Sequence, residues 1–332
     1  MRLIQYFGLP LALLSCISSA NEGLNKQEVV SSLVNEIENS YVETDKIPGL
    51  TKSLRQLKDN PAFHGAVTQD ELAALLSTEL KKTDPHFSVQ WRDPSGAVAQ
   101  KKNESWFAKL ARNNSGFNKV EILPGNVGYI DFWGFDNVTD DSKSTVTGVM
   151  KFVANADALL IDLRKNGGGS GEMVQLISSY FLKPETHLNS IYWRTTNTTR
   201  EFHTIKEVAA KANLTIPLYV LTSKGTFSAA EEFAYNLKHL GRATLVGEVT
   251  KGGANPWQYY ELGNGFRAGI PIAKAINPVT KSNWEGVGVK PDIVTTSEAA
   301  FNAAYKLALK DVAKVADNEY QLAQIKDKID TL

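Results

Sequence analysis

The chain has 332 residues, enough for two domains or for one large domain with a helical appendage. Lys plus Arg number 36 and Asp plus Glu number 36, so no net charge attracts nucleic acid and a nucleic-acid partner is not expected. With 42% hydrophobic residues and no low-complexity tract, the composition disfavours a disordered or fibrous chain and predicts a globular protein.

The first twenty residues have the pattern of a signal peptide. Arg2 precedes an apolar stretch, and Ser-Ser-Ala at 18–20 supplies the small residues of a cleavage site. These features predict an exported protein, periplasmic or secreted, whose mature chain begins at Asn21. An alternative interpretation takes Cys16, the single cysteine, as the lipid-attachment site of a lipoprotein. No other apolar stretch approaches the ~20 residues of a transmembrane helix.

Residues 24–82 carry helical patterns. Apolar residues recur there at three- and four-residue spacing in the stretches 29–37, 50–57 and 72–80. Thr68 and Glu71 have the spacing of a capping box at the start of the third stretch. The sequence therefore predicts an N-terminal three-helix domain over residues 21–85.

After residue 85, apolar runs typical of buried strands alternate with helical patterns. Strands are expected at 87–91, 127–132, 158–163, 218–221, 243–246, 257–262 and 266–272. Helices are expected at 138–153, after the glycines 167–169, at 228–240, and from residue 297 onward. This alternation predicts an α/β core with a C-terminal helical tail over residues 86–332.

A glycine-rich loop, 167–169, lies between a predicted buried strand and a helix. Without Cβ atoms, its backbone N–H groups are free to turn toward an anion or an oxyanion. The spacing is that of neither common phosphate-binding loop. If this loop is considered alone, the simpler interpretation is a tight turn between the strand and the helix.

Ser228 lies at the start of a predicted helix that follows another buried strand. The helix dipole and the free N–H groups of the first turn stabilise negative charge there, which suits a nucleophile. The simpler alternative is that Ser228 and Glu231 form a capping box.

A serine nucleophile needs a base and a group that orients the base. His86 is the favoured base and Glu285 the favoured supporting acid, although each is equally consistent with a loop residue on the surface. The five histidines show no metal-ligand spacing, so neither a metal nor another cofactor is expected.

The segments 162–169, 226–252 and 286–292 together resemble the peptidase domain of the C-terminal processing (tail-specific) serine proteases. The similarity is greatest to the branch that contains the tricorn core and the interphotoreceptor retinoid-binding protein modules. It implies a ClpP/crotonase-like core of ββα units with Ser228 as the nucleophile. It also implies an oxyanion hole made by backbone N–H groups near Gly168 and of Ala229.

The chain departs from the family pattern in two respects. Processing proteases usually carry a general-base lysine where this chain has Gly253, and Lys251 lies two residues too early. His86 and Glu285 instead match the places of the tricorn-like histidine and glutamate, although Pro85 replaces the serine that precedes that histidine. The stretch 86–127 is also too short for a PDZ domain, so none is expected.

These observations predict a hydrolase, an exported serine endopeptidase that cleaves peptides or unfolded proteins through an acyl-enzyme. The alternative is a carrier of a hydrophobic ligand, such as a retinoid or a fatty acid, because the retinoid-binding modules share the same motifs. Neither the physiological substrate nor the oligomeric state follows from the sequence.

Overall fold

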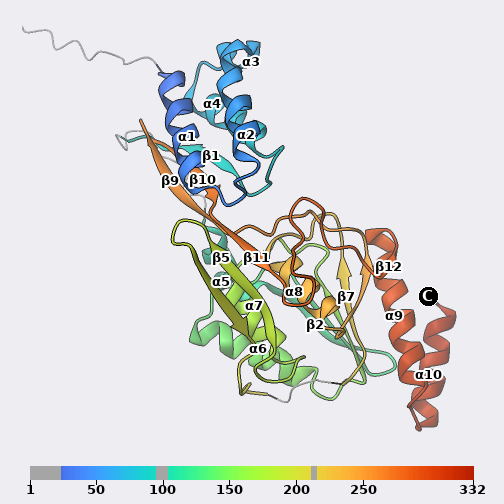
Figure 1. The fold of residues 1–332 in the computed structure, drawn as a ribbon. Coiled ribbons are helices and arrows are strands. Elements are labelled where there is room, and N and C mark those ends of the chain that lie inside the picture. Colours follow the sequence, from blue (N-terminus) through green and yellow to red (C-terminus); the bar gives the residue numbers. More distant parts are fainter. Residues whose placement is uncertain (1–23, 95–103, 211–214) are drawn as a thin grey trace, which may run out of the picture.

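The computed structural model describes residues 24–94, 104–210 and 215–332. The predicted cleavage site before Asn21 and the alternative lipid site at Cys16 lie outside these residues. The predicted α/β class is confirmed, because helices pack around a central six-stranded sheet (Figure 1).

The central sheet is parallel except at one edge. Its strands lie in the order β12 (Ile293–Val294), β8 (Thr244–Gly247), β7 (Leu218–Thr222), β4 (Ala158–Asp162), β3 (Val127–Phe132) and β2 (Phe117–Leu123). Only β2 runs antiparallel to its neighbour, and β4 and β7 are paired side by side in parallel. The ends of β4 and β7 therefore meet at the same edge of the sheet.

Helices cover both faces of the sheet, which is why β4 is apolar on both sides. On one face, Leu160 packs in a cluster with the small residues Ala304 and Ala308 of α9 (Ser297–Ala313). On the other face, Leu159 and Ile161 belong to the main core, as do residues of α6 (Asp140–Phe152), α7 (Gly171–Ser178) and α8 (Ala229–His239). α10 (Glu319–Asp330) packs on α9 at the outside of the molecule (Figure 1).

The N-terminal part holds four α-helices rather than three. The predicted stretches lie in α1 (Lys26–Ser40), in α2 (Ile47–Gln56) with the 3-10 turn that follows it, and in α4 (Gln69–Leu80), which begins with the predicted capping box. The additional α3 (Pro61–Gly65) is short, and the side chain of Asn60 caps it.

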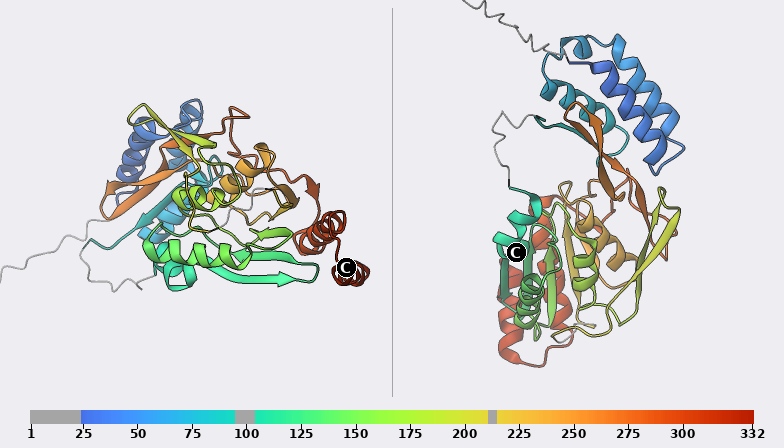
Figure 2. Two further views of the ribbon diagram at one scale, coloured as in Figure 1. Left: turned by 90° about the horizontal axis from the view of Figure 1, so that it is seen from below. Right: turned by 90° about the vertical axis from the view of Figure 1, so that its left-hand side faces the viewer.

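A hairpin from late in the chain completes this helical part. β1 (Ser88–Trp91) pairs with β10 (Phe266–Pro271), which pairs with β9 (Trp257–Gly263). α1 packs on both strands of the hairpin, and Figure 2 shows the hairpin reaching from the core to the helices. The segment just before β1 is thereby held against the core.

A third sheet and one further helix lie beside the core. β5 (His187–Trp193) pairs with β6 (Thr198–His203) and with β11 (Ala273–Ile276), and α5 (Trp106–Arg112) precedes β2. Neither β5 nor β6 was predicted from the sequence. β6 is mostly exposed and polar, so it has no apolar run that would indicate a strand.

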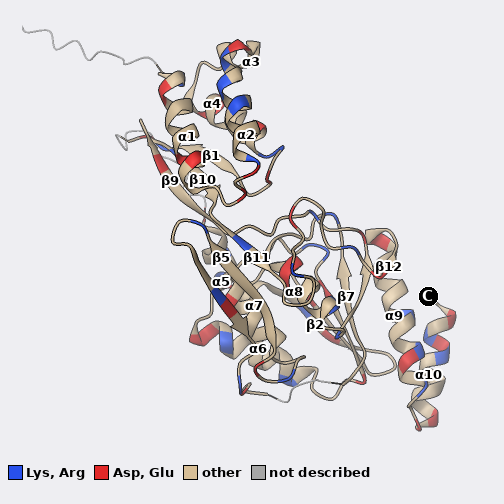
Figure 3. Ribbon diagram, in the orientation of Figure 1, with Lys and Arg blue, Asp and Glu red and all other residues tan. Residues whose placement is uncertain are grey.

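Charges of both signs are interspersed, as α10 illustrates (Figure 3). Among the helices that the structure describes, none combines the length and the apolar character needed to cross a lipid bilayer.

Candidate active site

Two loops meet at the edge of the sheet where β4 and β7 end. The hydroxyl of Thr226, after β7, donates to the carbonyl of Leu163, after β4, at 2.8 Å. The Ser223 hydroxyl donates to the carbonyl of Arg164 at 2.6 Å. These bonds fix the loop that carries Ser228 against the glycine-rich loop.

Hydrogen bonds of Asn166 also hold the glycine-rich loop in place. Its side-chain amide donates to the carbonyl of Phe132 at 2.9 Å, and its side-chain oxygen accepts the N–H of Gly168 at 2.9 Å. Its backbone carbonyl accepts the N–H of Phe227 at 3.1 Å. Asn166 is fully buried, so the loop is fixed by the interior of the protein.

Ser228 occupies a strained turn at the start of α8. Its backbone angles are φ 56° and ψ −121°, a region that residues with a Cβ rarely adopt. Such a residue costs about 1–3 kcal/mol and persists only where its surroundings enforce it. Here the carboxylate of Glu231 accepts the N–H of Ser228 at 2.8 Å, as one half of the predicted capping box.

The same Glu231 carboxylate is buried and gathers three further donors. These are the Thr250 hydroxyl and the N–H groups of Gly252 and Gly253, the latter two at 2.6 and 2.9 Å. Burial raises the pKa of Glu231, while these hydrogen bonds favour its ionised form. Glu231 therefore joins the turn at Ser228 to the segment 250–253.

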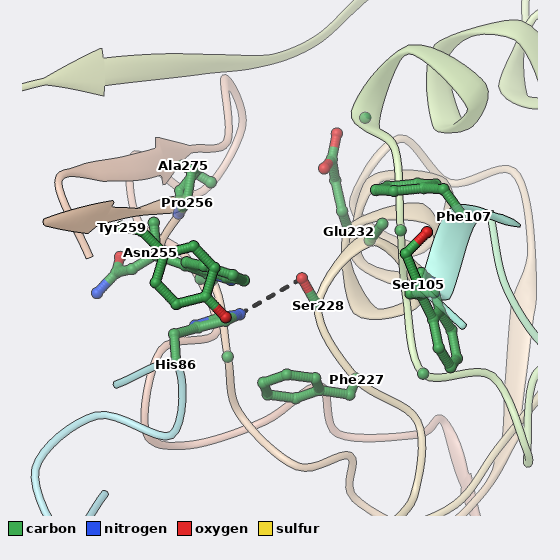
Figure 4. Close-up of a pocket in the computed structure, with 18 of the residues that line it drawn as sticks. His86, Ser105, Phe107, Phe227, Ser228, Glu232, Asn255, Pro256, Tyr259 and Ala275 are labelled. Atoms are coloured by element: carbon green, nitrogen blue, oxygen red, sulfur yellow. Dashed lines mark hydrogen bonds between the residues drawn. The ribbon is translucent and has the colours of Figure 1, made fainter. Parts of the chain in front are cut away.

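His86 reaches Ser228 from the opposite side of the cavity. Its Nε2 atom lies 3.4 Å from the Ser228 hydroxyl (Figure 4), and the residue is only 7% exposed. The N–H of His86 donates to Asp84 at 2.9 Å, and its Nδ1 atom lies 3.6 Å from the same carboxylate oxygen. The structure thus brings together the predicted serine and histidine from distant parts of the chain.

Because Gly253 has no side chain, the ring of His86 can lie against it. A Cβ atom at residue 253 would lie 2.7 Å from Cε1 of His86 and 2.2 Å from the ring of Phe227, closer than atoms can approach. The ammonium of Lys251, the nearest lysine in sequence, lies 4.4 Å from the ring centre of Phe227. A side chain at 253 and the observed position of His86 therefore exclude one another.

Glu285 lies close to both His86 and Asp84. One ligand atom each of Asp84, His86 and Glu285 lies within 4.8 Å of the others. Glu285 accepts the N–H of Ala254 at 2.6 Å through one oxygen. Its other oxygen and Nδ1 of His86 are buried, and neither has a hydrogen-bond partner among the residues described. Burial, followed by repulsion from Asp84, raises the pKa of Glu285 to about 8.

Asp84 was not among the site residues predicted from the sequence. The residue is fully buried, and its second oxygen faces the Tyr41 hydroxyl at 3.5 Å and the Asn255 amide at 3.1 Å. Its position two residues before His86 lets it bond the backbone and approach the ring at once. The signal available in the sequence was an acid two residues before the candidate base.

The glycine-rich loop presents a different N–H group from the one expected. The N–H of Gly168 already donates to Asn166, so it is not a free oxyanion donor as the sequence analysis expected. Gly169 lines the cavity together with Ser228 and Ala229. Neither Gly169 nor Ala229 has an acceptor for its N–H among the described residues.

A cavity of about 1750 Å³ opens over Ser228. Many aromatic residues line it, among them Trp106, Phe107, Trp193 and Trp257. Glu232 also faces this space, across Ser228 from His86 in Figure 4, and accepts the Asn189 amide at 2.8 Å. Burial raises the pKa of Glu232 to about 7.

A strained serine, a histidine within reach and a cavity with free N–H groups define the class of serine hydrolases in which a fixed turn carries the nucleophile. Residues 126–295, just over half of the chain, match the family described as "Peptidase family S41". The chain therefore belongs to peptidase family S41. The resemblance to the C-terminal processing serine proteases is confirmed at this level.

Individual relatives agree with this assignment. The chain is 29% identical over 203 residues to the carboxy-terminal processing protease CtpB of Bacillus subtilis, covering 60% of this chain and 40% of that protein. It is 32% identical over 168 residues to a carboxyl-terminal-processing protease of Synechocystis sp., covering 51% and 36%. The chain thus spans about two fifths of the length of these curated relatives.

A solved structure is similar in fold. The photosystem II D1 C-terminal processing protease superposes with a TM-score of 0.50 at 16% identity, covering 83% of this chain and 94% of that one. At this identity, the similarity concerns the fold alone.

Replacing Gly253 by alanine should disable the arrangement of His86 and Ser228. The added methyl group would overlap the His86 ring, and a displacement of about 1 Å can cost 10²-fold in rate. The rate of labelling by a fluorophosphonate probe, which reacts with activated serines, should fall by about that factor. Gly49→Ala is the matched control, because nothing lies within 4 Å of a Cβ at that helical position. Equal labelling rates in the two variants would contradict the steric argument.

Glu285→Gln should change how stability depends on pH. Because the folded protein holds a proton on Glu285 up to about pH 8, and the unfolded chain releases it near 4.5, this group lowers the free energy of unfolding as pH rises between those values. Removing the titration should flatten the fall in urea midpoint between about pH 5 and pH 8. Glu207→Gln, at an exposed position, should keep the slope of the unmodified protein. An unchanged slope in Glu285→Gln would show that the carboxyl is ionised throughout.

Proposed function

We propose that this protein is a serine endopeptidase that hydrolyses peptide bonds through an acyl-enzyme on Ser228. The single observation that carries the proposal is the 3.4 Å approach of His86 Nε2 to a Ser228 hydroxyl held in a strained turn. Membership of peptidase family S41 supports the same chemistry.

In this mechanism, Nε2 of His86 takes the hydroxyl proton as Ser228 attacks the peptide carbonyl. The carbonyl oxygen, now negatively charged, accepts hydrogen bonds from the N–H groups of Gly169 and Ala229. His86 then returns the proton to the leaving amine as the C–N bond breaks. A water molecule, activated by the same histidine, hydrolyses the ester and frees Ser228.

Two carboxyl groups would support the base. Asp84, 3.6 Å from Nδ1, would favour the tautomer in which Nδ1 carries the proton, so that Nε2 is free to accept one. Glu285 would be the supporting acid predicted from the sequence. A positive imidazolium would lower the pKa of this neighbouring carboxyl and favour its ionised form, which stabilises the charge in return.

The substrate would be an extended peptide or a segment of an unfolded protein. A scissile bond must lie between His86 and the loop at Gly169, inside a cavity whose walls come from several elements. An extended backbone fits such a space, whereas a folded surface does not enter it.

The wider organisation is part of the proposal. It comprises export directed by residues 1–20, an N-terminal helical domain over 21–85, and a ClpP/crotonase-like core over 86–332 without a PDZ domain. The S41 assignment supports such a core, and the apolar N-terminal stretch supports export to the periplasm or the medium.

A second candidate is a carrier of an apolar ligand. The aromatic lining of the cavity favours it, because Trp and Phe side chains bury large apolar ligands well. Such a carrier would need neither the strain at Ser228 nor a histidine beside it.

Ser228→Ala tests the proposed nucleophile. The purified protein should be labelled by a fluorophosphonate at Ser228, as mass mapping of peptides would show, and the alanine variant should lose labelling and any peptidase activity. The thermal midpoint is the control, since Ser228 contributes to the fold through its backbone N–H, which alanine retains. A stable alanine variant that still cleaves peptides would refute the assignment. Micromolar retinoid or fatty-acid binding without labelling or cleavage would favour the carrier.

His86→Ala and Lys251→Ala identify the base. Loss of a general base typically costs 10²- to 10⁴-fold, so the acylation rate should fall by about 10²-fold or more in His86→Ala. It should change little in Lys251→Ala, because that ammonium lies over Phe227. A large loss confined to the lysine variant, measured by single-turnover labelling, would exclude the histidine base.

A further inference from the structure

A group of potential metal ligands lies on the β5–β6 hairpin, away from Ser228. His187 begins β5 and His203 ends β6, and the two residues are paired across the hairpin. Their rings stack with centres 4.7 Å apart at 23°. Glu201 precedes His203 by two residues, which places both on the same face of the strand. One ligand atom of each of the three lies within 4.8 Å of the others.

The hydrogen bonds of His187 leave one ring nitrogen available. Its Nε2 atom lies 3.0 Å from the backbone carbonyl of Asn189. A carbonyl oxygen can only accept, so Nε2 carries the hydrogen and Nδ1 presents a lone pair. A histidine that ligates a metal commonly donates its other N–H to a backbone carbonyl in this way. His187 therefore has the backbone hydrogen bond that commonly fixes the ring of a metal-ligating histidine.

The other two ligands are accessible from solvent. Nε2 of His203 lies 3.6 Å from the carboxylate of Glu201, and their side chains are 39% and 61% exposed. Ligands of a tetrahedral zinc ion, each about 2.0–2.2 Å from the metal, lie roughly 3.4 Å from one another. Because the Glu201 side chain is exposed, it can move the short distance that brings its carboxylate from 3.6 Å to roughly 3.4 Å from Nε2 of His203.

We propose that His187, Glu201 and His203 bind a divalent zinc ion, or a transition metal of similar preference, on the face of the hairpin that bears these three side chains. Two imidazoles and one carboxylate form a donor set typical of zinc with a fourth position open to water. Magnesium and calcium prefer sets of oxygen ligands and should bind poorly.

The proposed metal site adjoins the wall of the cavity over Ser228. The carbonyl that orients His187 belongs to Asn189, whose side chain bonds Glu232 in the cavity. Asn189 pairs across the hairpin with Phe202, and both residues line the cavity. A metal that joins β5 to β6 would hold this part of the cavity wall in place.

Zinc titration of chelator-treated protein tests the proposal. Calorimetry should show one zinc ion bound with micromolar or tighter affinity, and the thermal midpoint should rise with zinc but not with magnesium. Glu201→Gln, His187→Ala and His203→Ala should each weaken zinc binding at least 10-fold. The exposed Glu201 is the variant least able to disturb folding, and the thermal midpoint without zinc checks all three.

Two controls separate this site from other histidines. The double variant His64→Ala with His239→Ala should bind zinc as the unmodified protein does. His86→Ala should also leave the affinity and the stoichiometry unchanged, since Asp84, His86 and Glu285 form the competing group of close ligand atoms. Zinc binding that His86→Ala abolishes, or that survives His187→Ala, His203→Ala and Glu201→Gln, would overturn the proposal. Millimolar or absent binding would overturn it equally.

Discussion

The arrangement around Ser228 depends on one buried carboxylate, that of Glu231. It accepts the N–H of Ser228 on one side and, on the other, the Thr250 hydroxyl and the N–H groups of Gly252 and Gly253. A buried acid with four donors is well stabilised, whereas its removal would leave these donors, three of them buried, without this acceptor. The strained turn at Ser228 can persist because this network over-determines it. The same network sets the distance between Ser228 and the segment beside which His86 lies.

The network around Glu231 also bears on residue 253, where processing proteases usually carry a lysine and this chain has glycine. Residue 253 is held by its own N–H, so its Cα has no freedom to withdraw from His86. A side chain there would occupy the volume of the His86 and Phe227 rings. The glycine at 253 and the observed position of His86 therefore depend on each other, and His86, the proposed base, comes from the loop before β1. A lysine at 253 would have to be accompanied by the departure of His86.

Much of the fold was predictable because its signal is local. A run that is apolar at every position, such as β4, indicates a strand buried on both faces, and the capping box at Thr68 marks the start of α4. The β5–β6 hairpin was missed because β6 is exposed and polar. Ser228, His86 and Glu285 were singled out from their local sequence and then supported by a resemblance, since no spacing in the sequence shows that they meet. The free N–H group of Gly169 and the contacts of the buried Asp84 could not be predicted, because they depend on hydrogen bonds between residues far apart in the sequence.

The position of His86 also ties the active site to the docking of the helical part. The N–H of Val42, after α1, donates to the carbonyl of Pro271 in β10, and the Tyr41 hydroxyl faces Asp84. On the core side, the indole N–H of Trp284 donates to the carbonyl of Gly253 at 2.9 Å. His86 thus lies between two groups of contacts, one from each part of the molecule, within one continuous hydrophobic core. A loosening of the helical part against the β9–β10 hairpin would therefore displace His86, whereas the turn at Ser228 is held by Glu231 within the core.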